Sequence, residues 1–247
     1  MPDTADRLII ELDGERIECA IVRSARRRTI AIQIDHDGLS IRAPQRASER
    51  RLRAAVQSRS DWISIKLAEW STRQKPAQRQ FVSGETLPFL GEMIALQIVE
   101  HPTRARTKVA RGDDRLVVEI DRLLTGDMRS NTVRKGVERW YRREAENLFP
   151  NRVQHYAAQL GRPVKKVQVR DQKRRWGSCD SNGVIRLNWR LAGADMDLID
   201  YVCAHEVAHL IEPNHSAAFW AVVSDLMPDW KVRRQRLNAT AGEFVPF

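Results

Sequence analysis

The chain has 247 residues, of which 42% are hydrophobic and 30% charged, a balance typical of a folded globular protein and not of a disordered one. Its three cysteines form no CxxC pair, which argues against a disulfide framework or a thiolate zinc site, and no apolar run reaches the roughly 20 residues that cross a membrane. The net charge of +10 favours anionic partners such as nucleic acid or nucleotides, although an arginine-rich surface can also be merely solvated.

Residues 1–75 are predicted to form an N-terminal region of β-strands followed by a helix. The first six residues are acidic and polar, unlike a signal peptide, so we expect a cytoplasmic protein. Apolar residues alternate with others over 30–34 and again over 39–43, and Asp37-Gly38 between them supplies a tight turn. This pattern predicts a β-hairpin.

A long amphipathic helix is predicted after the hairpin. Ser48 is expected to be its N-cap, and apolar residues recur at helical spacing from Leu52 to Trp70. Residues 73–80 contain Pro76 and few apolar side chains. They are therefore the predicted linker between two domains.

The second domain is predicted over residues 81–247, with a catalytic core at about 130–240. Its first part is rich in β-strand patterns, and the periodicity becomes helical at about Asn131. Pro150 is expected to interrupt this helix, because proline lacks the backbone N–H that a helix interior requires. A further helix should then end at Gly161. The sequence shows no internal repeat.

Short strands and helices are predicted in the last third of the chain. Val167 and Val169 indicate a strand, residues 171–183 a polar loop, and residues 184–191 a second strand. We expect this second strand to lie at a sheet edge, where an extended substrate could pair with it. Asp195 or Asp197 should cap the helix that follows.

Three histidines near the C-terminus form the most specific motif of the chain. His205 and His209 are four residues apart and so share one face of a helix, where two imidazoles can bind one Zn²⁺ ion. His215 follows soon after Pro213, which should end the helix, and is well placed to be a third ligand. The sequence therefore predicts one zinc ion held by three histidines with an open fourth position.

Glu206 is the predicted catalytic residue. It lies beside the first histidine, where a carboxylate can take a proton from zinc-bound water. This arrangement is typical of a zinc-dependent hydrolase. If Glu206 or Glu212 were instead a fourth zinc ligand, the site would be closed and structural.

The polar loop and the strand after it are predicted to bind the substrate. The candidate contacts are Lys173, Arg174, Arg175, Trp176, Gly177, Ser178 and Asn188. If the substrate is a peptide, Arg175 or the backbone at 177–178 would donate to the oxyanion. If it is a nucleotide, the three consecutive basic residues would clamp phosphate oxygens, although the loop lacks a GxxxxGK[ST] cradle and carboxylates for Mg²⁺. A third alternative is a zinc-stabilised module whose basic surface binds nucleic acid.

The last third of the chain resembles the YgjP-like metallopeptidase family, which is related to the SprT-like zincins. The resemblance is dense over about residues 165–237 and is carried by RWGSC at 175–179, IRLNWRL at 185–191, IDYV at 199–202, HEVAH at 205–209, NHS at 214–216 and FW at 219–220. It extends more thinly into the N-terminal half, at residues 42–44, Phe81, Gly84 and residues 90–91.

The resemblance implies an α+β protein with a zincin-like C-terminal catalytic domain, in which the HExxH helix packs on a small β-sheet. A β-rich N-terminal region with the long helix would precede this domain. It also implies zinc on His205, His209 and His215, with Glu206 as general base. Members of the family have been described both as metallopeptidases and as a nucleoside triphosphate (UTP) pyrophosphatase. We therefore predict a zinc-dependent metallopeptidase, with a UTP pyrophosphatase that uses the same metal site as the alternative.

Overall fold

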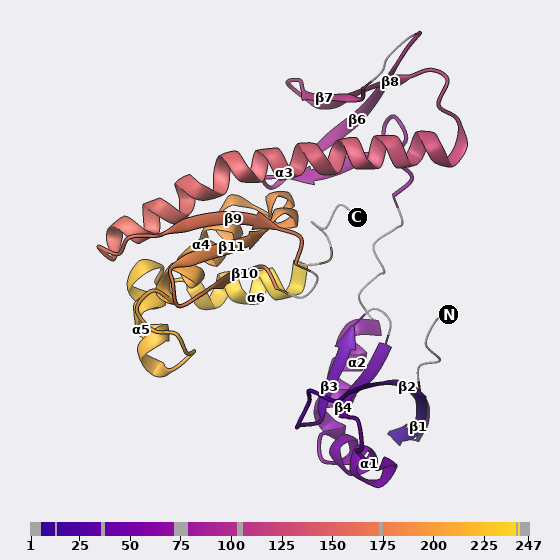
Figure 1. Cartoon of the computed structure of the whole chain (residues 1–247), viewed down its shortest axis with the longest axis vertical. Helices are drawn as coiled ribbons and strands as arrows, with labels where there is room; N and C mark the ends of the chain where they lie inside the picture. The colour runs from indigo at the N-terminus through magenta and orange to yellow at the C-terminus, as the bar shows by residue number, and fades with distance from the viewer. Residues whose placement is uncertain are drawn as a thin grey trace. The chain divides into compact units, whose positions relative to one another are not determined.

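The protein is an α+β fold whose described residues form several small sheets and helices (Figure 1). The computed structural model describes residues 6–12, 14–35, 38–71, 79–102, 106–172, 175–240 and 242. The chain divides into two compact units, Met1–Ala77 and Gln78–Phe247. Most of the predicted linker lies outside the described residues. None of the described helices is both long and apolar enough to span a membrane.

The first unit contains a four-stranded sheet and two helices. The strand order is β1-β2-β4-β3, with β2 parallel to β4 and the outer pairs antiparallel. The elements are β1 Asp6–Leu12, β2 Glu15–Ser24, β3 Ala31–Asp35, β4 Gly38–Pro44, α1 Glu49–Gln57 and α2 Ser60–Ser71. The pairing of β3 with β4 confirms the predicted hairpin, while Asp37 of its turn lies outside the described residues.

The prediction of one long helix in this unit is wrong, because two helices meet at Ser58. The Ser58 hydroxyl donates to the Ala55 carbonyl at 3.0 Å, and the Arg59 N–H bonds to the Val56 carbonyl at 3.0 Å. Such local serine bonds compete with helix propagation and end α1. Leu52 of α1 and Ile63 of α2 are both fully buried, so the break lets each helix present its own apolar face to the sheet.

The second unit contains two sheets. The four-stranded sheet has the order β5-β6-β8-β7, with β6 parallel to β8 and antiparallel outer pairs, and thus repeats the topology of the first unit's sheet. The repeat exists in topology although none is visible in the sequence. The three-stranded sheet has the order β10-β11-β9. The strands are β5 Thr86–Phe89, β6 Glu92–His101, β7 Lys108–Arg111, β8 Arg115–Asp121, β9 Lys166–Arg170, β10 Gly177–Cys179 and β11 Val184–Asn188.

The expectation that the second strand of the last third would offer a free edge is wrong. This strand is β11, and it lies between β10, its antiparallel partner, and β9, its parallel partner. Both of its sides are therefore paired. The predicted polar loop before it contains β10, a three-residue strand that forms one edge of this sheet.

The helix α3, Gly126–Gln159, passes through Pro150 without a break, so the predicted interruption is wrong. A proline inside a helix costs about 3 kcal/mol. Ala145, Phe149 and Val153, on both sides of the proline, are fully buried, and each large apolar side chain contributes about 1.5–3 kcal/mol by burial. This burial offsets the cost of Pro150. Gly161 follows the helix in a left-handed conformation, with φ +61°, which confirms the predicted cap.

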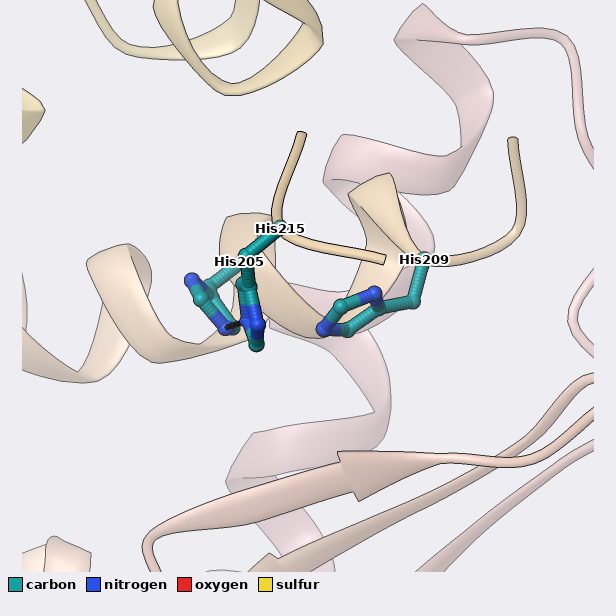
Figure 2. Close-up of side chains that lie close together, drawn as sticks. All are labelled: His205, His209 and His215. Atoms are coloured by element: carbon teal, nitrogen blue, oxygen red, sulfur yellow. Dashed lines mark hydrogen bonds between the residues drawn. The ribbon is translucent and has the colours of Figure 1, made fainter. Parts of the chain in front are cut away.

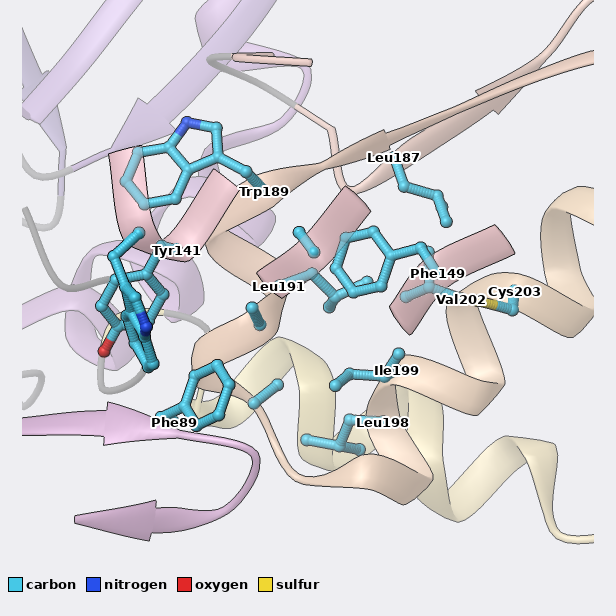
Figure 3. Packing of buried hydrophobic residues seen from close by; sticks show 14 of the residues in the cluster. Phe89, Tyr141, Phe149, Leu187, Trp189, Leu191, Leu198, Ile199, Val202 and Cys203 are labelled. Atoms are coloured by element: carbon cyan, nitrogen blue, oxygen red, sulfur yellow. The ribbon is translucent and has the colours of Figure 1, made fainter. Parts of the chain in front are cut away.

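One apolar core joins α3, both sheets of the second unit and α4 (Figure 3). The remaining elements are η1 Trp189–Gly193, α4 Met196–Ala208, α5 Ala217–Leu226 and α6 Trp230–Thr240. Two hydrogen bonds of 2.6 and 2.7 Å join the Arg152 guanidinium of α3 to the Asp200 carboxylate of α4. This core and this ion pair fix the helix that carries the histidines.

Candidate metal centre

The end of α4 brings two of the three histidines to one place. The helix begins after its N-cap Asp195, as predicted, and ends at Ala208, so His205 lies in the last turn and His209 is the C-cap residue. The helix thus ends before Pro213, the residue expected to stop it. The chain then turns, with the Glu212 N–H bonded to the Ala208 carbonyl at 3.1 Å. His215 follows this turn, directly before Ser216, the N-cap of α5.

The three histidine rings converge (Figure 2). One ring nitrogen from each of His205, His209 and His215 lies within 4.8 Å of the other two. The Nε2 atoms of His205 and His215 are 3.0 Å apart. Two nitrogens bound to one tetrahedral Zn²⁺ at about 2.0–2.1 Å would be separated by about 3.3 Å. The spacing of the rings therefore fits a shared small cation.

The surroundings of His205 and His209 favour neutral imidazoles, because burial lowers the pKa of both rings. His209 Nδ1 lies 3.0 Å from the Glu212 carbonyl oxygen, a bond that directs the opposite nitrogen toward the other rings. Burial, reinforced by the neighbouring histidines, lowers the pKa of His205 to about 3. His205 is therefore neutral at pH 7 and retains a lone pair for a metal ion.

An aromatic wall supports the three rings from α5. The Phe219 ring is fully buried and lies 4.5–4.9 Å, centroid to centroid, from each of the three imidazoles. Trp220 stacks on His215 at 5.7 Å and on Trp230 of α6 at 4.2 Å. The sequence analysis names Phe219 only within the family resemblance at 219–220, and the spacing of the residue does not reveal this contact with the histidines.

Glu206 lies beside the trio in a buried position. It is 5% exposed, and its Oε2 atom has no hydrogen-bond partner among the described residues. Burial raises the pKa of Glu206 to about 8, while the positive charge of Arg175 acts in the opposite direction. A bound divalent cation would also favour the ionised carboxylate. An unpartnered buried carboxylate next to three imidazoles is the setting that a metal ion and its water would complete.

Gly177 of β10 packs directly against Glu206. A Cβ atom at position 177 would lie 2.6 Å from both Cγ and Oε1 of Glu206. No side chain fits in this space, so the glycine allows the strand to approach the carboxylate closely. The predictions gave Gly177 a role toward substrate, whereas the structure shows its contact with Glu206.

A cleft of about 510 Å³ opens over this group, between β10 and α4. Its lining includes the three histidines and Glu206. The profile of the YgjP-like metallopeptidase domain matches residues 28–240. The chain belongs to the YgjP-like metallopeptidase family.

Two solved structures are similar to part of this family member. The metallopeptidase zymogen abylysin of Pyrococcus abyssi is 24% identical, and the match covers 36% of this chain and 91% of abylysin, with a TM-score of 0.34. The metallopeptidase zymogen jannalysin of Methanocaldococcus jannaschii is 16% identical, and the match covers 38% of this chain and 96% of jannalysin, with a TM-score of 0.34. No curated protein matches the chain.

Four of the predicted substrate-binding residues line the cleft of this YgjP-like protein: Arg175, Trp176, Gly177 and Ser178. Lys173 and Arg174 lie outside the described residues. Glu212, the alternative fourth ligand, is not part of the group of side chains that could hold one metal ion, which among the described residues consists of the three histidines.

Asn188 lies beneath the predicted loop and is 4% exposed. Its Nδ2 donates to the carbonyls of Gln172 and Arg175 at 2.6 and 3.3 Å, and its Oδ1 accepts from the Arg190 N–H at 3.1 Å. These bonds hold the two ends of the segment that carries the basic residues. Neighbouring Trp189 is fully buried, which agrees with core packing.

Tyr201 is a cleft residue that the sequence analysis missed. It lies four residues before His205 on α4, is 4% exposed and lines the cleft. The helical spacing of Tyr201, His205 and His209 is the signal that could have identified it, since residues four apart share a helix face.

Proposed function

We propose that this YgjP-like protein is a zinc-dependent metallopeptidase. The single observation that carries the proposal is the convergence of three imidazoles and one buried carboxylate on the same cleft. His205, His209 and His215 would hold the ion, and a three-histidine set leaves a position for water or substrate. A bound Zn²⁺ supplies Lewis-acid chemistry, because it acidifies water and polarises a carbonyl group.

Glu206 is the proposed general base. Its carboxylate is held between α4 and the Gly177 backbone, with Oε2 available for a proton. It would take a proton from water as the peptide carbonyl is attacked and pass it to the leaving amine. The zincin-like arrangement, with the HExxH helix under a small sheet, is part of this proposal.

The β10 edge is the proposed place for an extended substrate. β10 contributes Gly177, Ser178 and Cys179 to the cleft and is an edge strand of its sheet. A peptide could add to this edge through backbone hydrogen bonds and so lie across the metal centre. Arg175, at the same side of the cleft, would donate to the carbonyl oxygen of the substrate.

Nucleotide hydrolysis is the second candidate, and Arg175 in the cleft favours it, since a guanidinium binds phosphate oxygens well. The small number of available carboxylates in the cleft favours the peptidase instead. Besides Glu206, the lining contains Asp180, which accepts from the backbone N–H groups of Asn182 and Val184 and pairs with Arg186. A Mg²⁺–nucleotide site would need carboxylates that are not already engaged.

The test compares two substrates and two variants of the full chain. Zinc-loaded protein is offered an unfolded protein in one assay and UTP in another, and bound zinc is measured by elemental analysis. Glu206→Gln should retain one zinc ion and lose peptidase activity by about 10²–10⁴-fold, the usual contribution of a general base. His209→Ala should lose the zinc ion as well.

Each other outcome has a distinct meaning. UTP hydrolysis that Glu206→Gln abolishes, without proteolysis, would replace the peptidase by the nucleotide hydrolase. Zinc that binds and stabilises the fold, with neither hydrolysis detectable, would leave a structural metal site. Wild-type activity in Glu206→Gln would reject the proposed role of this residue.

A further inference from the structure

A second hollow lies in the second unit, away from the residues of the histidine cleft. It measures about 320 Å³ and lies between β7 and the first half of α3. Arg106 and Lys108 line it from the β7 side, Arg139 and Arg143 line it from α3, and Gly136 and Trp140 form its floor. No residue lines both hollows. We call the second hollow the basic groove.

Gly136 sets the closeness of the two walls of the groove. A Cβ at this position would lie 3.0 Å from Cγ2 of Thr107 and 3.1 Å from Cγ2 of Val109. The missing side chain therefore lets β7 approach α3, and the basic side chains on both elements border the same narrow space. The groove is thus formed by the close packing of β7 against α3.

The groove has a large excess of positive charge. Its lining contains four basic residues, Arg106, Lys108, Arg139 and Arg143, and no acidic residue. The acidic residues beside it on α3 are Glu138 and Glu144, and Glu144 is paired with Arg143 at 3.1 Å. Glu138 is already paired with Arg142 at 2.7 Å. Lys108 and Arg139 are exposed and form no ion pair within the described part of the chain. Their charges are therefore available to a ligand.

The positive charges form a row. Lys135, Arg139 and Arg143 are spaced four residues apart on α3 and so follow one face of the helix, at about 6 Å of rise per step. Lys108 and Arg106 line the opposite wall of the groove. A row of cations suits a chain of phosphates, whereas a single compact anion would need a converging cluster.

We propose that the basic groove binds the phosphate backbone of a nucleic acid without reading its bases. Trp140 is only 2% exposed and is packed against Phe89 and Tyr141, so no aromatic face is presented for base stacking. A membrane surface fits less well, because the apolar members of the lining are buried or half-buried and cannot insert among lipids. The net charge of +10 adds long-range attraction to the same partner.

The test measures binding of a labelled duplex oligonucleotide to the full chain by fluorescence anisotropy, at several salt concentrations. Lys108→Ala/Arg139→Ala removes two of the proposed phosphate contacts. We expect its affinity to fall by about tenfold or more, and the slope of log K against log salt to decrease by about 2. Thermal unfolding checks that both exposed substitutions leave the fold intact.

The matched control is Arg50→Ala/Arg59→Ala, which removes the same charge from exposed positions of the first unit. Its affinity should change by less than about threefold, because these two residues do not line the groove and contribute only screened attraction. An equal loss in both double variants would mean diffuse attraction and overturn the proposal. It would also be overturned if wild type does not bind the duplex, or if it binds phosphatidylserine vesicles through Lys108 and Arg139 and the duplex not at all.

Discussion

The two four-stranded sheets share strand order and directions, but their helices differ. In the first module (residues 6–71, β1–β4 with α1 and α2), two short helices cover the sheet. In the second module (residues 86–159, β5–β8 with α3), one helix of 34 residues, about 50 Å long, packs on the sheet and continues to α4 and β9. The same sheet topology therefore forms a self-contained unit where short helices follow it, and supports the candidate site where one long helix follows it.

The second half of α3 is where this platform meets the metal centre. Phe149 lies in one packed cluster with Ile199 and Val202 of α4 (Figure 3). Arg152 is paired with Asp200, five residues before His205. We therefore expect substitutions in this half of α3 to alter zinc affinity at the candidate metal centre, and equal substitutions in the first module to leave it unchanged.

The largest expected effect is that of Phe149→Ala. Removing this fully buried ring should lower the free energy of unfolding by about 3–5 kcal/mol and weaken zinc binding, because the cavity lies between α3 and α4. Leu52→Ala, in α1 of the first module, should cost about 2–5 kcal/mol and leave zinc affinity unchanged. Chemical denaturation and zinc titration measure both quantities. Equal loss of zinc affinity in the two variants would contradict the claim that only the second half of α3 supports the candidate metal centre.

The next effect concerns two glycines of the second unit, one in the site and one in the second module. Gly177→Ala should displace Glu206 and lower kcat by about 100-fold, because a shift of about 1 Å in a reacting group has an effect of this size. Gly112→Ala, whose Cβ would meet its nearest neighbour at 3.6 Å, should change kcat by less than about twofold. Peptidase assays on both variants, each with its zinc content measured, provide the check. Full activity in Gly177→Ala would show that the close contact with Glu206 is unimportant.

The smallest effect compares two ion pairs. Arg152→Ala breaks a pair whose side chains are 29% and 15% exposed, and should lower stability by about 2 kcal/mol through loss of two charge-assisted hydrogen bonds. Arg7→Ala breaks the Arg7–Glu18 pair, whose side chains are 67% and 55% exposed, and should lower stability less than Arg152→Ala does, because solvent screens an exposed pair. Unfolding midpoints in denaturant distinguish the two. A larger loss of stability in Arg7→Ala would contradict the view that the ion pair between α3 and α4 contributes more to stability than an exposed pair.

Features that depend on neighbouring residues were predictable from the sequence. The β3–β4 hairpin follows from local alternation, and the Gly161 cap follows from the need for a left-handed residue after α3. The three histidines were also predictable as a group, since their spacing on a helix and after a turn brings them together in any fold that forms that helix.

Features that depend on distant parts of the chain were not predictable. α3 continues through Pro150 because Phe149 and Val153 are buried against other elements, which the local sequence does not show. β10 has only three residues and no apolar alternation, and it becomes a strand through its pairing with β11, as in Gly177 opposite Leu187. The same pairing placed β11 in the middle of the sheet and moved the available edge to β10.

The position of His209 as the C-cap residue also gives the backbone an electrostatic part in the proposed ion binding. The last carbonyl groups of α4 carry the negative pole of the helix dipole, equivalent to about half an elementary charge, directly at the histidine trio. This pole attracts a cation by about 0.3–1 kcal/mol and repels an anion to a similar extent. An anionic substrate should therefore enter the site only after the divalent ion has reversed the local field.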